Sequence, residues 1–294
     1  MSDARQVIDK LLERPGRLAI GAALAIALFW SYASSLGMLV YRWWNEPDYV
    51  YGFLVVPFAV GLLWMRRDMA PRHSRGSLWG LAFLGLMALM RFASAYLQYQ
   101  LIDPVSLVPC LAGLTLLTLG WAGLRWAWPA ILYLVFMVPL PGFLASLMSQ
   151  PLQMIGATTS TYFLQTLGIP AVARGTVIGL SHSDLGVEEA CSGLRMLMLF
   201  LAVCTAAALV MHRDPWQRVI LVISAAPIAV IANVLRITIT GVLYETSGPE
   251  WAEMVFHDLA GWLMMPLAVV LSWLEMGLLA MLFRPAEEWE SEWI

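Results

Sequence analysis

The chain alternates long apolar runs with short polar connections, and most of the runs have the length of a membrane-spanning helix. A helix needs about 20 apolar residues to cross the hydrocarbon core of a bilayer, because each residue advances it by about 1.5 Å. The apolar runs lie near 18–40, 50–65, 77–97, 104–123, 127–148, 192–211, 219–240 and 257–283. This pattern predicts an all-α polytopic membrane protein with about eight transmembrane helices.

The segment 149–190, between the fifth and sixth runs, breaks the pattern. From 150 to 167 glutamine, serine and threonine interrupt the apolar residues, which is typical of a helix that lies at the membrane interface. The sequence Gly-Ile-Pro at 168–170 ends that helix. Residues 176–180 and 185–187 then predict a small β-hairpin.

Composition supports the membrane class, since 60% of the residues are hydrophobic and only 13% are charged. Soluble domains are roughly half apolar and a quarter charged. The sequence has no basic stripe of the kind that binds nucleic acid. Membrane lipids are the surroundings that this composition predicts.

Lysine and arginine collect at alternate ends of the runs, which predicts the orientation because cytoplasmic loops are enriched in these cations. One set of ends holds Arg5, Lys10, Arg14, Arg17, Arg66, Arg67, Arg72, Arg75, Arg125, Arg213, Arg218 and Arg284, and the other holds only Arg42 and Arg174. We therefore expect a cytoplasmic segment 1–17, a membrane domain 18–283 whose loop 149–190 is extracytoplasmic, and an acidic cytoplasmic tail 284–294. Both termini are then cytoplasmic.

Three arginines, Arg91, Arg195 and Arg236, fall within or at the edge of predicted spans, in the outer half of the membrane. A cation at that depth is costly and usually faces a cavity or a partner. For Arg91, a side chain that reaches the outer headgroups is an equally good interpretation.

Cys191 stands where the sixth run begins, and the positive end of a helix dipole favours the thiolate there. Ser192 and the glycine after it permit a tight turn around an exposed nucleophile. Glu188, Glu189 and Arg195 flank the thiol. The other two cysteines, Cys110 and Cys204, lie within apolar runs, where a free cysteine usually serves as a small buried hydrophobe.

Two further residues complete a candidate set for acyl transfer. His257 begins the eighth run, and Arg236 lies at the outer end of the seventh, three residues after Asn233 and on the same helical face. A thiol, an imidazole and a cation at one depth can act as nucleophile, proton carrier and oxyanion stabiliser. Cys191, His182 and His257 lack the spacing of a metal site, so we expect no metal and no cofactor. His182 itself fits an exposed turn.

At these residues the sequence resembles the exosortase/archaeosortase family of membrane cysteine transpeptidases. The resemblance lies in 189–195 (EACSGLR), in 233–237 (NVLRI) and in His257, and weaker likeness extends from about 45 to 283. Some relatives carry a histidine where this chain has Tyr51.

The resemblance implies an enzyme of the bacterial inner membrane whose active site faces the periplasm. Its substrate would be the C-terminal sorting region of a secreted protein, with a Pro-Glu-Pro-like motif before a transmembrane helix. Cys191 would form a thioester with that protein, and His257 would protonate the leaving amine and then activate an acceptor nucleophile of unknown identity. Arg236 would stabilise the oxyanion, while Asn233 would orient Arg236 or donate to the same oxygen. Arg195 would pair with Glu188 or Glu189, or bind a substrate carboxylate.

Three other functions remain open from the residues alone. A transporter or channel for an anionic solute would also place arginines within the membrane. An intramembrane protease would differ only in that water reaches the acyl-enzyme. A scaffold protein would bind partners through its outer loop and would not need Cys191.

Overall fold

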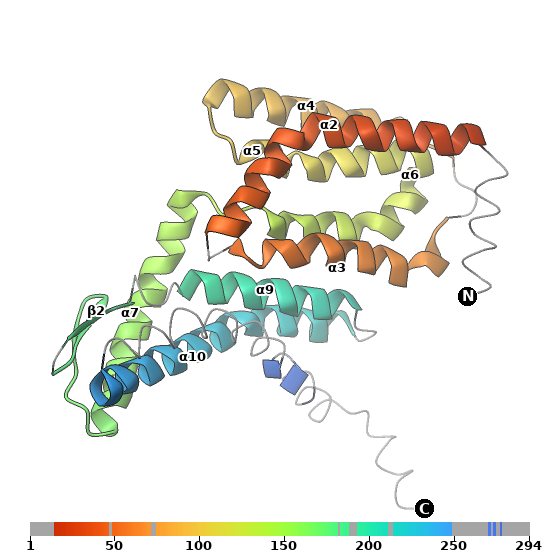
Figure 1. Cartoon of the computed structure of the whole chain (residues 1–294). Coiled ribbons are helices and arrows are strands. Elements are labelled where there is room, and N and C mark those ends of the chain that lie inside the picture. The colour runs from red at the N-terminus through yellow and green to blue at the C-terminus, as the bar shows by residue number, and fades with distance from the viewer. Residues whose placement is uncertain are drawn as a thin grey trace, which may run out of the picture.

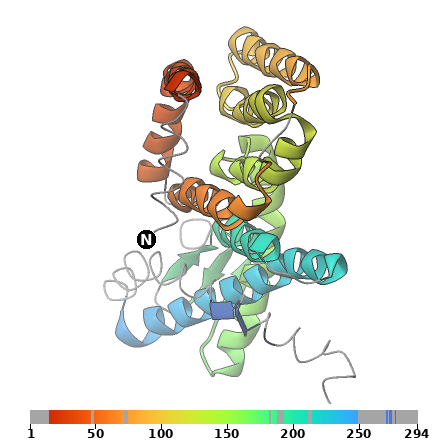
Figure 2. The ribbon, with the colours of Figure 1, turned by 90° about the vertical axis from the view of Figure 1, so that its right-hand side faces the viewer.

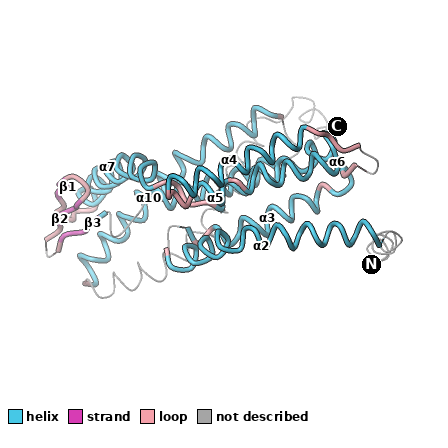
Figure 3. The backbone as a smooth tube through the Cα atoms, turned by 90° about the horizontal axis from the view of Figure 1, so that it is seen from above, coloured by secondary structure: helices cyan, strands magenta, loops and turns pink. Residues whose placement is uncertain are grey.

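The computed structural model describes residues 15–46, 49–71, 75–181, 183–187, 193–210 and 214–248, with 270–271, 273–274 and 277 (Figure 1). Its elements are α2 (Pro15–Asn45), α3 (Gly52–Met65), η2 (Arg67–Met69), α4 (Trp79–Leu97), α5 (Ile102–Val105), α6 (Leu107–Tyr133), η3 (Leu134–Met137), α7 (Gly142–Thr166), β1 (Val172–Arg174), β2 (Val177–Gly179), β3 (Asp184–Gly186), α9 (Gly193–Val210) and α10 (Pro215–Ser247). The described chain is therefore mostly helical with one small sheet, as the sequence predicts. Figure 3 shows the strands gathered at one end of the helices.

Four elements of the described part are long and apolar enough to cross a membrane. They are Trp79–Leu97, Ile102–Met137, Gly193–Val210 and Pro215–Ser247. Large apolar side chains such as Trp30, Leu89 and Ile231 point outward from the helices, as they do where lipid is the solvent. The chain is thus a helical membrane protein, and the count of eight spans stays a prediction.

The 36-residue element Ile102–Met137 reverses its direction at Gly120, whose φ of 60° and ψ of −162° interrupt α6. The first half of α6 runs antiparallel to α4: Ser77 N donates to the Leu116 carbonyl at 2.8 Å, near the start of α4. The second half runs antiparallel to α3, since Trp126 Nε1 donates to the Arg66 carbonyl at 2.8 Å beyond the end of α3. The fourth and fifth apolar runs are therefore the two halves of α6, and their chain directions are opposite. Figure 2 shows α3 between the α4–α6 pair and the α9–α10 pair.

The fifth run contains two prolines that predict a kink or an end of its helix, and the helix ends just before them. Its helix stops at Met137, and the backbone from 138 to 141 is not helical because Pro139 and Pro141 cannot continue it. Residues 142–148, which the apolar pattern assigns to the fifth span, instead form the start of α7. Gly168, with φ of 83°, follows the end of α7, in agreement with the predicted stop at 168–170. In Figure 1 α7 is steeply inclined to α3, α6 and α9.

The predicted hairpin is one part of a three-stranded antiparallel sheet in the order β1-β2-β3. Ala173 pairs with Ile178, and Ile178 pairs with Leu185. Ile178, Leu185 and Val187 are buried together with Ala157 and Leu164 of α7 and Ile237 of α10. The sheet therefore packs where α7 crosses α10.

The described arginines among those that predict the orientation lie at the expected ends of the helices. Arg66 Nη2 lies 3.4 Å from the Arg125 carbonyl, while Arg75 precedes a glycine that packs on Leu117. At the opposite end Arg42 lies in the last turn of α2, and Arg174 lies in the sheet. The predicted orientation in the membrane depends on this distribution of arginines between the two ends. The orientation itself stays a prediction.

Candidate functional site

The described residues contain one part of the predicted site. Asn233 and Arg236 lie in α10 and Arg195 lies in the first turn of α9. The other predicted residues, Glu188, Glu189, Cys191, Ser192 and His257, fall outside the described residues, as does His182.

Both α10 side chains are buried at the end of the bundle that carries α7 and the sheet. Asn233 is 3% exposed and Arg236 is 7% exposed. The spacing of three residues places them on one face of the helix, as the sequence predicts. Their neighbour Ile237 joins the apolar cluster under the sheet, so α10 is held firmly at this level.

The Asn233 side chain lies against two glycines from two different helices. A Cβ placed on Gly193, the first residue of α9, would lie 3.2 Å from Asn233 Nδ2 and 3.0 Å from Leu152 Cβ. A Cβ on Gly156 of α7 would lie 3.3 Å from the same nitrogen and 2.9 Å from Ile237 Cδ1. The absence of side chains at 156 and 193 thus lets α7, α9 and α10 meet around one amide.

α7 carries buried polar residues that the sequence pattern does not single out, and one of them bonds α10 next to this junction. Ser160 Oγ donates to the Val234 carbonyl at 3.1 Å and is fully buried. Gln153 and Thr161 are 8% and 6% exposed. The polar residues of 150–167 predict an interfacial helix. Some of this polarity instead belongs to the interface between α7 and α10. The spacing of Gln153, Gly156 and Ser160 at three and four residues is the signal that would have identified it.

The sequence that forms these elements matches a known family. The family model of the transmembrane exosortases matches residues 43–274, which is most of the chain. The chain belongs to the transmembrane exosortase family. No curated protein and no solved structure matches it. The match includes the start of α9, the Asn233–Arg236 face of α10 and position 257. The family is one of membrane cysteine transpeptidases that act on sorting signals.

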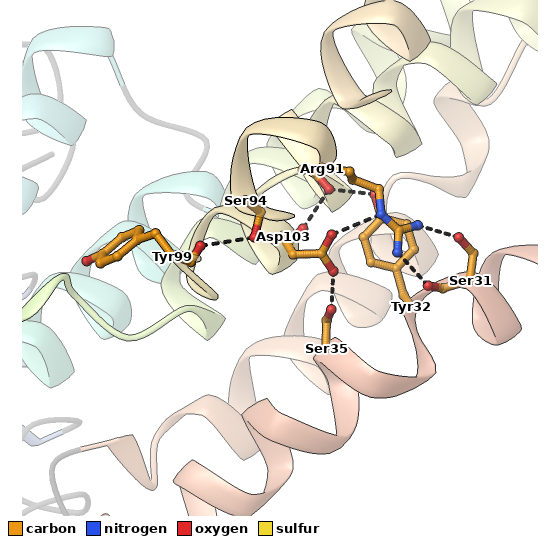
Figure 4. Close-up of polar contacts among 8 residues, drawn as sticks. Ser31, Tyr32, Ser35, Arg91, Ser94, Tyr99 and Asp103 are labelled. Carbon is orange, nitrogen blue, oxygen red and sulfur yellow. Dashed lines mark hydrogen bonds and ion pairs between the residues drawn. The ribbon is translucent and has the colours of Figure 1, made fainter. Parts of the chain in front are cut away.

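Arg91 belongs to a different part of this exosortase. Its Nε donates to Asp103 Oδ1 at 2.9 Å, its Nη2 donates to the Ser31 carbonyl at 2.8 Å, and its Nη1 bonds the Ser31 hydroxyl (Figure 4). Ser35 donates to the second oxygen of Asp103, and the guanidinium carbon lies 4.6 Å from the centre of the Tyr32 ring. Arg91 thus links α2, α4 and α5, and neither snorkelling nor a catalytic role is needed to explain it.

The described residues give no indication of a metal centre. Within those ranges no three histidine, cysteine, aspartate or glutamate side chains gather as ligands. The chemistry that the described site offers is therefore that of an amide, a guanidinium and hydroxyl groups in a water-poor environment.

Proposed function

We propose that this exosortase is a cysteine transpeptidase that cleaves the C-terminal sorting signal of secreted proteins and transfers the protein to an acceptor. Family membership supports the class of reaction. The observation that carries the assignment of residues is the contact between the Asn233 amide and Gly193. Cys191 precedes Gly193 by two residues, so its Cα lies at most about 7 Å from that of Gly193. This short connection supports the proposal that the nucleophile acts near the face of α10 that carries Asn233 and Arg236.

In the proposed reaction the Cys191 thiolate attacks the carbonyl carbon of the scissile peptide. The new C–S bond gives a tetrahedral intermediate, which collapses to the thioester as the C–N bond breaks and the leaving amine takes a proton from His257. The acceptor then loses its proton to His257 and attacks the thioester, which releases the thiolate.

Arg236 is suited to stabilise the oxyanion of both tetrahedral intermediates. Its charge is permanent and its donors form a planar fork. A donor in a dry site contributes far more than one in water, and Arg236 is 7% exposed. Asn233 lies one turn before it on the same face, where it can orient the guanidinium or donate to the same oxygen. Ser192, Glu188, Glu189 and Arg195 are proposed to support the nucleophile or bind the substrate.

Up to Asn233, α10 has few of the buried polar side chains that would line the path of an anion transporter. Between Gln217 near its start and Asn233, the buried positions of α10 are apolar over about three turns, at Leu221, Ala225, Ala229 and Ala232. A solute path along this helix would need polar side chains at both depths. This apolar stretch favours a site at one end of the bundle.

We further propose eight spans with both termini in the cytoplasm of a bacterium, and a site that faces the periplasm across the inner membrane. The cation distribution and the reversal at Gly120, which separates the fourth and fifth spans, support this topology. The substrate's own transmembrane helix would then lie beside the exosortase in the same bilayer.

The deciding experiment co-expresses this protein with a secreted reporter that ends in a Pro-Glu-Pro-like motif, a transmembrane helix and a basic tail. Cys191→Ala, Arg236→Ala and His257→Ala are expected to abolish shortening of the reporter, while Cys204→Ala retains it. Mass analysis of the new C-terminus separates transfer from hydrolysis. Shortening by Cys191→Ala at the wild-type rate would rule out the thiol mechanism.

A further inference from the structure

The last strand of the small sheet, β3, turns part of its backbone away from the sheet. In an antiparallel ladder alternate residues direct their N–H and C=O groups toward the partner strand, and the residues between them direct these groups the other way. Val187 N donates to the Thr176 carbonyl at 2.9 Å, directly after β3, so Leu185, two residues earlier, also bonds toward β2. Asp184 and Gly186 therefore point their backbone groups to the outer edge of β3.

This outer edge is open in the described structure. β3 lies at one side of the sheet, and the backbone groups of Asp184 and Gly186 have no hydrogen bond to a described residue on that side. Asp184 is exposed and Gly186 is partly exposed. The Asp184 carboxylate lies toward β2, with Oδ1 3.3 Å from the place of a Cβ on Gly179, so it does not cover the edge. An uncovered edge of this kind is a template for another extended chain.

β3 packs against the helix that carries Arg236. Leu185 of β3 is buried in one apolar cluster with Ile237 of α10, which directly follows Arg236. Cys191 follows Gly186 by five residues, so their Cα atoms lie at most about 18 Å apart. Since an extended chain advances about 3.3 Å per residue, a strand alongside β3 can reach the proposed nucleophile within about five residues.

We propose that the outer edge of β3 binds the extended sorting motif of the substrate as a fourth strand. The inference rests on the proposed function, for which it names the surface that holds the substrate. Backbone hydrogen bonds to Asp184 and Gly186 supply affinity and fix the register of the scissile bond with respect to Cys191.

The spacing of the prolines in a Pro-Glu-Pro-like motif suits this edge. Proline has no N–H to donate and is accepted in an edge strand where its nitrogen faces away from the neighbouring strand. Two prolines two residues apart face the same way, so both can point outward while the residue between them turns its N–H and C=O to β3. That residue also precedes a proline, which favours the extended conformation. The motif can therefore pair with Gly186 or Asp184 without a hydrogen bond from either proline.

Disulfide cross-linking tests the position of the motif, with Cys191→Ala protein in lipid nanodiscs and the uncleaved tail-bearing reporter. Asp184→Cys in the protein is combined with single cysteines at successive positions of the reporter's motif. Residues directly opposite each other in a sheet have Cβ atoms about 4.5–5.5 Å apart, and the next residues along the strand point to the other face. Cross-links are therefore expected at every second reporter position. The control is Arg174→Cys in β1, which is exposed at the opposite side of the sheet and is expected to give none.

Proline substitution tests the backbone hydrogen bonds. Gly186→Pro removes an N–H that the sheet itself does not use, and it is expected to weaken reporter binding at least about threefold, the effect of one hydrogen bond. Ala173→Pro is the matched control, because Ala173 holds the equivalent outward position in β1, opposite Ile178. Both variants are expected to shift the unfolding midpoint equally little, since proline is tolerated at such edge positions.

No cross-links, cross-links without alternation, equal cross-links on both sides of the sheet, or unchanged affinity of Gly186→Pro would each overturn the inference. Disulfides between two Asp184→Cys copies in place of reporter cross-links would also overturn it, because the edge would then bind a second copy of this chain. Since binding is measured without cleavage, these results are independent of whether Cys191 is the nucleophile. Alternating cross-links together with a wild-type protein that does not shorten the reporter would instead contradict the proposed cleavage.

Discussion

Arg91 of α4 donates to Asp103 of α5 at 2.9 Å, and the same two side chains bind Ser31 and Ser35 of α2. The pair therefore joins α2, the first described helix, to α4 and α5 (Figure 4). The Arg91 guanidinium has enough hydrogen bonds within the protein that it does not need to reach the lipid headgroups. This explains how an arginine is tolerated in an apolar run.

Asp103→Asn is expected to destabilise the protein by about 2 kcal/mol, because Arg91 loses its charged acceptor. Thermal unfolding in detergent measures the change. Arg42→Ala is the control, since Arg42 and Glu46 form a partly exposed pair at 3.7 Å, whose loss is expected to cost less than about 1 kcal/mol. Equal shifts for the two variants would show that the Arg91 network does not fasten α2.

Gly193→Ala and Gly156→Ala are expected to reduce reporter processing by at least about tenfold per folded molecule. Each new Cβ would lie within 3.3 Å of Asn233 Nδ2, and packed surroundings accommodate such overlap only by shifting, at about 1–3 kcal/mol. Gly85→Ala serves as the control, because nothing lies within 4 Å of the Cβ that it adds to α4. Full activity of both site variants would mean that the position of the Asn233 amide is unimportant.

Arg236→Lys is expected to lower the rate of processing about a hundredfold, the usual effect of losing an oxyanion donor. Lysine keeps the charge but lacks the planar fork. The comparison variant is Arg75→Lys, at an exposed position near the start of α4. If Arg236→Lys processed the reporter at the wild-type rate, the charge alone would suffice.

A cysteine at position 174 is expected to react with a membrane-impermeant maleimide from the periplasmic side, and a cysteine at 75 only from the cytoplasmic side. Arg174 and Arg75 are exposed at opposite ends of the protein. The background is Cys191→Ala, since Cys110 and Cys204 are buried. Right-side-out and inverted vesicles provide the two sides, and the reverse labelling would invert the proposed topology.

The sequence is sufficient to predict features that depend on neighbouring residues. Pro139 and Pro141 end a helix because proline lacks the amide hydrogen, and the face shared by Asn233 and Arg236 follows from helical spacing. The strand at 177–179 lies within the predicted hairpin. Family membership, predicted from the residues around 191 and 236, is confirmed by the family model.

Features that depend on distant partners are not predictable in this way. β1 is three residues long with two exposed side chains, so only its pairing with β2 reveals it as a strand. Ser31 and Arg91 are 60 residues apart, and no spacing rule connects them. The polar residues of α7 have the same composition whether they face water, headgroups or α10, and burial alone distinguishes these environments.

The length of α10 determines where in the bilayer the proposed chemistry takes place. Its 33 residues extend about 50 Å, far beyond the roughly 30 Å of hydrocarbon. Asn233 comes 18 residues after Pro215, about 27 Å along the axis, which is close to one hydrocarbon thickness. With the start of α10 at the inner boundary, the amide stands where acyl chains give way to headgroups. In the proposed reaction, a water-soluble acceptor would therefore arrive from outside without entering the hydrocarbon core, while the cleaved transmembrane helix of the substrate would stay in the bilayer.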